Sequence, residues 1–99
     1  MDNTLTPLPA ARAEVLALQA LGWLASQDDL LATFLGASGA AIDDLRDRAT
    51  DPAFLGAVLD FVLMDDAWVL GFADHAQIAP LMVLRARAGL PGGDMPHWT

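Results

Sequence analysis

The sequence contains no cysteine, no lysine and no tyrosine. The absence of cysteine excludes a disulfide framework, a catalytic thiol and a thiolate metal site. Uncharged apolar runs stay short of the about 18 residues that a membrane-spanning helix requires. The N-terminal stretch has an aspartate at position 2 and no basic segment, so it does not resemble a secretion signal. We therefore expect a soluble, cytoplasmic protein.

Positive charge is also scarce. Five arginines stand against 13 acidic residues, and the formal net charge is −8. Nucleic-acid binding requires cations that neutralise phosphates, and an anionic membrane surface repels a chain of this charge. We expect neither nucleic acid nor membrane as a partner, and we favour an unknown protein partner or self-association.

What the sequence does contain is apolar material for one core. The chain has 99 residues, of which 55% are hydrophobic, and this suits a single domain. No segment alternates as a strand does, so the sequence predicts an all-α fold, a compact bundle of five to six short helices. Along the chain we expect a flexible leader over residues 1–8, a helical domain over 9–90 and a non-helical C-terminal tail over 91–99 that packs back on the bundle.

Breaks in the helical pattern divide the domain. The first predicted helix, Pro9 to Ala25, is apolar around most of its circumference, which is typical of a central helix. Acidic, proline and glycine signals bound the other helices. These signals are a capping box at Ser26-Gln27-Asp28-Asp29, an N-cap near Asp43, the restart Thr50-Asp51-Pro52, the start Asp65-Asp66, and the ends of the last helix at Pro80 and Gly89. Similar segments 37 to 39 positions apart (65 − 28 and 85 − 46) indicate a pseudo-duplicated three-helix unit.

Few residues are arranged as a metal site or a catalytic site requires. The three Asp doublets all fall where a helix should begin, so we interpret them as capping charges rather than metal ligands. His75 and His97 lack the spacing of three or four residues that helical metal ligands have. His75 is predicted to be a packed or capping residue on the face of Phe72 and Trp68. We expect no catalytic residue, no cofactor site and no metal site, and hence no enzyme.

Asp60 is the one charge inside the apolar fourth helix. Its side of that helix carries Ala53, Gly56, Ala57 and Met64, which predicts a narrow exposed stripe of small residues with one charge. A buried, functional carboxylate is the alternative.

The remaining candidates concern recognition of a partner. Met64 and Trp68, together with Met82, Met95 and Trp98, can line an apolar groove for a partner helix, or can be ordinary core. The ending PGGDMPHWT cannot be helical, and we expect it to fold back so that Trp98 fills a gap between helices. A short linear motif read by another protein is the alternative. The candidate interaction residues are Met64, Trp68, His75, Asp94, His97 and Trp98.

Three features resemble a small bacterial family of alphaproteobacterial type, the domain of unknown function DUF3572. They are the Leu59-Asp60-Phe61 segment with the acidic pair after it, the restart at Asp51 to Leu55, and above all the ending Pro91-Gly92-Gly93-Asp94-x-Pro96-His97-Trp98. The resemblance runs from about Ala13 to Thr99. It implies a compact helical protein and supplies no activity, cofactor or catalytic residue.

The leading functional hypothesis is a non-catalytic protein–protein interaction or regulatory module, with homodimer formation as one version. A binder of a small apolar ligand within the helical bundle is the alternative from a second class. A carboxylate- and His-dependent enzyme or metal protein is the third.

Overall fold

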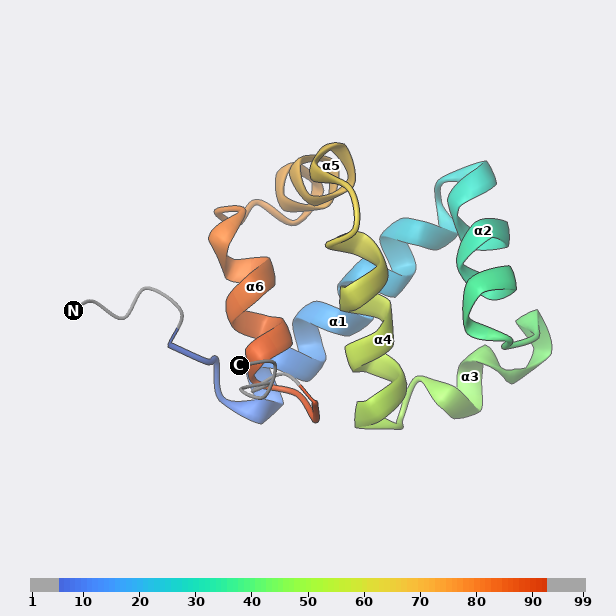
Figure 1. Ribbon diagram of the computed structural model, residues 1–99, viewed down its shortest axis with the longest axis horizontal. Helices are drawn as coiled ribbons and strands as arrows, with labels where there is room; N and C mark the ends of the chain where they lie inside the picture. The colour runs from blue at the N-terminus through green and yellow to red at the C-terminus, as the bar shows by residue number, and fades with distance from the viewer. Residues whose placement is uncertain (1–5, 93–99) are drawn as a thin grey trace, which may run out of the picture.

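The computed structural model describes residues 6–92, which fold into six α-helices and one short 3-10 helix (Figure 1). The all-α prediction is confirmed. The elements in order are α1 (Ala10–Ala25), α2 (Asp28–Ser38), the 3-10 helix η1 (Ile42–Asp44), α3 (Leu45–Arg48), α4 (Pro52–Val62), α5 (Asp66–Ala76) and α6 (Leu81–Ala88).

Helix α1 is the centre of the bundle, as its composition predicts. It packs against α2, α4, α5 and α6. Helix α4 is the second core element, because seven of its 11 residues are buried. The largest fully buried side chains come from five of the helices, and each contributes about 1.5–3 kcal/mol of burial. They are Leu16, Leu24, Phe34, Leu55, Val58, Leu59, Val62, Phe72 and Val83.

Aspartate caps begin α4 and α5 as predicted. The Asp51 carboxylate accepts a hydrogen bond from the Ala53 N–H at 3.0 Å, and Pro52 occupies the first turn. The Asp65 carboxylate accepts from the Ala67 N–H at 2.8 Å. Each cap satisfies a backbone donor that has no partner within the helix.

The other two predicted helix starts lack a side-chain cap. Helix α2 begins after Gln27 without a side-chain cap, and Ser26 instead ends α1, where its hydroxyl donates to the Trp23 carbonyl at 2.7 Å. Only two residues separate the two helices, and the Ser26 N–H still donates to the Gly22 carbonyl, so Ser26 belongs to the first of them. Asp43 lies in the first turn of η1, next to Asp44, the N-cap residue of α3, but neither η1 nor α3 has a side-chain cap.

Both ends of the described chain lie on α6. Residues 6–8, part of the predicted flexible leader, pack there: Leu8 is buried and its N–H donates to the Arg85 carbonyl at 3.0 Å. Arg85 in turn donates from Nε to the Thr6 carbonyl oxygen at 2.8 Å. Of the predicted tail, Pro91 and Gly92 are described and are not helical. Residues 93–99, with Asp94, His97 and Trp98, lie outside the described residues, and so does the predicted packing of Trp98.

Gly89 ends α6 for a reason that differs from the expected one. Its φ of −84° is right-handed, so no left-handed cap requires glycine here. A Cβ at this position would instead overlap the Leu8 carbonyl oxygen and lie 3.2 Å from the Ala13 Cβ. Glycine is needed because the incoming chain crosses directly over the end of α6.

The predicted duplication holds for the order of elements and not for their packing. Each half has two longer helices followed by a shorter one. Helix α6 packs on α1 and α4, whereas the principal contact of α3 is with η1. The second short helix is therefore a core element, and the first lies at the edge of the bundle (Figure 1).

Candidate interaction site

One face of α1 is uncovered although this helix is the centre of the bundle. Val15 is 50% exposed and Leu18 is 44% exposed, and Ala11, Gly22 and Ala25 are exposed as well. We call these five residues the α1 seam. They follow one another at intervals of four, three, four and three residues, which is the a/d spacing of a coiled-coil seam. This spacing is the one found on helix faces that pack against a second helix in coiled coils.

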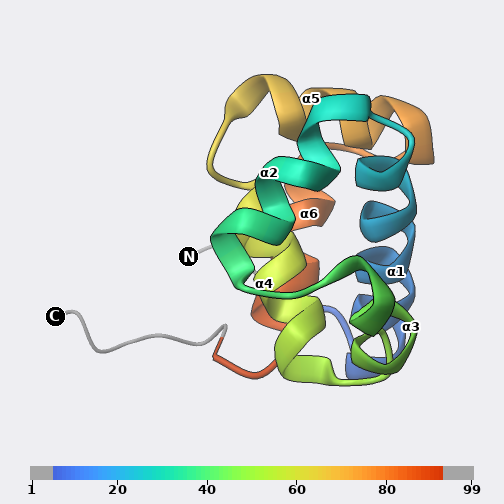
Figure 2. The same cartoon turned by 90° about the vertical axis from the view of Figure 1, so that its right-hand side faces the viewer.

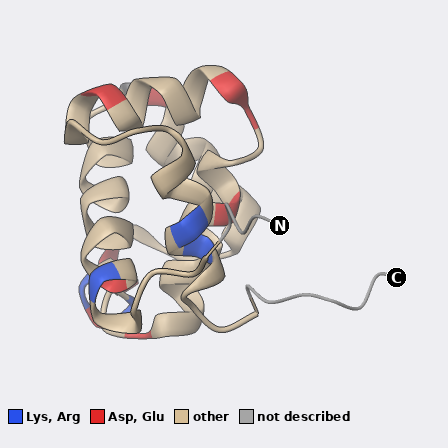
Figure 3. Cartoon of the chain, turned by 90° about the vertical axis from the view of Figure 1, so that its left-hand side faces the viewer, with Lys and Arg blue, Asp and Glu red and all other residues tan. Residues whose placement is uncertain are grey.

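The α1 seam is almost free of charge. The only charged residues of α1 are Arg12 and Glu14, both near its N-terminal end. Figure 3 marks the charged positions, and most of α1 is drawn in tan. Covering the seam therefore removes little charge from water, so the desolvation penalty for a partner is small.

A depression of about 490 Å³ lies beside the C-terminal half of the seam. It is lined by Gln19, Gly22, His75 and Ala76. A Cβ on Gly22 would have no heavy atom within 4 Å, so the space is open to an incoming side chain. His75 is exposed on the rim, so the prediction that it is packed is wrong, whereas its predicted place near a helix C-terminus is confirmed because it lies in the last turn of α5. Phe72 and Ala73 form the buried side of α5, and the helix ends at Ala76, just after His75.

A second hollow, the α2–α4 groove, has a volume of about 170 Å³. Met64 is 74% exposed on its edge, while Phe34 and Phe61 form its floor at 1% and 5% exposure. Trp68 stacks on Phe61 with ring centroids 4.8 Å apart and an interplanar angle of 21°. Two predicted candidates, Met64 and Trp68, thus share Phe61 as a neighbour, but only Met64 lines the groove. Its lining residues are Phe34, Ala37, Ser38, Ala57, Asp60, Phe61 and Met64.

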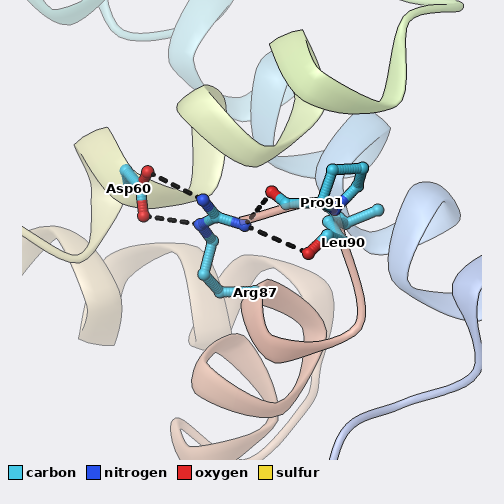
Figure 4. Close-up of polar contacts among 4 residues, drawn as sticks. All are labelled: Asp60, Arg87, Leu90 and Pro91. Carbon is cyan, nitrogen blue, oxygen red and sulfur yellow. Dashed lines mark hydrogen bonds and ion pairs between the residues drawn. The ribbon is translucent and has the colours of Figure 1, made fainter. Parts of the chain in front are cut away.

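Asp60 lies on the rim of this groove and forms an ion pair with Arg87 (Figure 4). Arg87 donates from Nε to Oδ1 at 2.6 Å and from Nη2 to Oδ2 at 3.2 Å. The same guanidinium donates from Nη1 to the Pro91 carbonyl at 2.9 Å and to the Leu90 carbonyl at 3.5 Å. Gly56 makes room, because a Cβ there would lie 3.0 Å from Nη1. Asp60 and Ala53 are exposed, as the predicted stripe requires, but Gly56 is buried beneath Arg87, so the stripe is not continuous. Asp60 also has an ion-pair partner that the sequence does not reveal.

Arg87→Ala is expected to lower the free energy of unfolding by about 1–2 kcal/mol, because it removes both the ion pair with Asp60 and the hydrogen bonds to the Leu90 and Pro91 carbonyls. Asp60→Ala is expected to lower the free energy of unfolding by less than about 1 kcal/mol, because the Asp60 side chain is 58% exposed and solvent screens the ion pair. Urea unfolding of the two variants measures the difference. Equal losses of unfolding free energy in the two variants would contradict the expectation that the hydrogen bonds from Arg87 to the two carbonyls contribute more than the ion pair.

The described part of the chain places no three His, Asp or Glu side chains where they could hold one metal ion. Within residues 6–92, no single helix is long and apolar enough to cross a membrane, and α5 and α6 reach that composition only when taken together across a bend of 94°.

Residues 10–93 match the sequence profile of a family described as "Protein of unknown function (DUF3572)". No curated protein and no solved structure matches the chain.

Proposed function

We propose that this chain, which belongs to the DUF3572 family, is a non-catalytic protein-interaction module that pairs through the α1 seam with the same helix of a second copy. The observation that carries the proposal is the exposure of Val15 and Leu18 on an uncharged face with coiled-coil spacing. Apolar residues exposed in a continuous pattern are typical of an interaction surface.

The seam is complementary to itself when two helices run antiparallel. With Leu18 opposite its own copy, Ala11 lies opposite Ala25, and Val15 lies one residue from the position opposite Gly22. A larger side chain thus lies next to the smallest one, and the depression beside Gly22 has room for Val15. Small residues along the contact also allow the two helix axes to approach to about 8 Å, the lower limit for packed helices.

The size of the seam predicts a transient association. Fully burying a Val or Leu side chain contributes about 1.5–3 kcal/mol, and these two are already half-covered. Two copies of each therefore supply about 3–6 kcal/mol, which is of the same order as the free-energy cost of bringing two molecules together. Because this gain at most offsets that cost, we expect a dissociation constant in the millimolar range, supported by the close packing of the small seam residues, rather than an obligate dimer.

Leu18→Glu is expected to weaken self-association at least about tenfold, because the antiparallel pairing brings two like charges together at the centre of the interface. Sedimentation velocity over a concentration series measures the effect. Leu84→Glu on α6 is the matched control, since Leu84 is 42% exposed against 44% for Leu18. Circular dichroism verifies that both variants are folded.

Equal weakening by the two substitutions would contradict the α1 seam as the interface. A native chain that remains monomeric at millimolar concentration would contradict self-association itself. The alternative of a small apolar ligand enclosed within the bundle gains no support from the two hollows described above, because both are surface depressions rather than enclosed cavities.

A further inference from the structure

The α2–α4 groove lies beside the point where the described chain leaves the bundle. Arg87 binds Asp60 on the groove rim and the Pro91 carbonyl with one guanidinium group (Figure 4). A Cβ on Gly56 would lie 3.4 Å from the same carbonyl oxygen, and the next residue, Ala57, lines the groove. The chain beyond Gly92 therefore begins about one helical turn from the groove.

We propose that the α2–α4 groove binds the side chain of Trp98, which belongs to the segment 93–99 outside the described residues. The groove is thereby filled by its own chain and does not compete with the α1 seam for a partner. In Figure 2, α1 lies on the right-hand side of the molecule and the described chain leaves on the left. The two surfaces are thus separate, and the two proposals are independent.

The length of the segment fits. Trp98 follows Gly92 by six residues, and six extended residues span at most about 20 Å. From Ala57 to Phe61 the groove runs about 6 Å along α4, at a rise of about 1.5 Å per residue, and Met64 follows in the turn after the helix. Trp98 can therefore reach any part of the groove, with length left over for the bends that Gly93 and Pro96 favour.

The chemistry of the groove suits an indole. Its floor is aromatic, and Ala37 and Ala57 on the facing helices provide space because their side chains are small. The rim carries the Asp60 carboxylate, which has acceptor positions left after it binds Arg87. An indole has a large apolar body and a single N–H donor, and it needs both kinds of neighbour.

The apolar floor and the Asp60 acceptor of the groove also favour Trp98 over the other residues of the segment. Met95 is the only other large apolar side chain between residues 93 and 99, and it has no donor for Asp60. His97 has a donor but a much smaller apolar surface. Trp98 alone combines the two properties that the groove presents.

The NMR resonance of the Met64 methyl group shows whether Trp98 occupies the α2–α4 groove, because an aromatic ring over this methyl group shifts its resonance upfield. The full chain has four methionines, so a spectrum labelled at the methionine methyl carbons is simple. We expect the Met64 resonance to lie upfield in the native chain and to move downfield in Trp98→Ala. Met82, half-buried on α6 and outside the groove, should remain unchanged in the same spectra.

Two further variants sharpen the test. Ala57→Leu fills the groove and should release Trp98, whereas Ala53→Leu, one turn earlier on the exposed side of α4, should not. An unchanged Met64 resonance in Trp98→Ala would overturn the proposal. So would a Met64 shift that disappears on dilution, because the ring would then come from a second copy.

Discussion

Phe34→Ala is expected to lower the free energy of unfolding by about 3–5 kcal/mol. Among the α2 side chains that the structure describes, Phe34 is the only one that is fully buried. Its ring meets Phe54 and Phe61 of α4 edge-on, with centroids 5.6 Å and 5.4 Å apart. Removing it leaves a cavity at the junction of the two helices, so a loss of more than about 12 °C in thermal midpoint should follow.

Thr33→Ala is the control for this substitution, since Thr33 is the exposed neighbour of Phe34 on the same helix. Its midpoint should change by only a few degrees. Hydrogen exchange should show the largest loss of protection in α2, because Phe34 is its deepest contact. A loss below about 1 kcal/mol would mean that surrounding side chains refill the space.

Gly89→Ala is expected to cost about 1–3 kcal/mol, the range typical of overpacking. The new methyl group would overlap the Leu8 carbonyl oxygen and press on Ala13 in the core of α1. Neither neighbour is a flexible side-chain end, so the leader must move away from α6. Thermal unfolding should show a midpoint about 4–8 °C lower for each kcal/mol lost.

Gly36→Ala provides the matched comparison. Gly36 is exposed inside α2, and a Cβ there would meet nothing within 4 Å. Alanine favours the helix by up to about 1 kcal/mol relative to glycine, so this variant should be slightly more stable than the native chain. If both substitutions were stabilising, the close approach of Leu8 to Gly89 would be refuted.

The helix boundaries that depend on local chemistry were predictable from sequence. Asp51 with Pro52, and Asp65, act within two residues of themselves, so their caps were correctly predicted. Ser26 shows the limit of this reasoning, because one serine between two helices can end the first or begin the second. Local sequence contains no information that separates those outcomes.

Contacts between distant segments were not predictable. Asp60 and Arg87 are 27 residues apart, and nothing near either position indicates the other. Gly89 was correctly expected at a helix end, but the reason lies in Leu8, at the other end of the chain.

The α1 seam was missed for a related reason. Helical periodicity shows that α1 is apolar on most sides, and it does not show which side the neighbouring helices leave open. The a/d spacing of Val15 and Leu18 was the available signal. Of the predicted interaction residues, Met64 and Trp68 lie near each other and His75 borders a different hollow, so the candidates do not form one site.

The attachment of both described chain ends to α6 has a topological consequence. Arg85 binds the carbonyl of Thr6 and Arg87 that of Pro91, and Leu8 crosses over Gly89, so the polypeptide enters and leaves the domain at neighbouring points. A domain with adjacent ends can be inserted into a surface loop of a host protein without separating the two halves of that loop. It can also be circularly permuted by joining its ends through a short linker and opening the chain elsewhere. This helical unit therefore has the chain topology that domain insertion and circular permutation require.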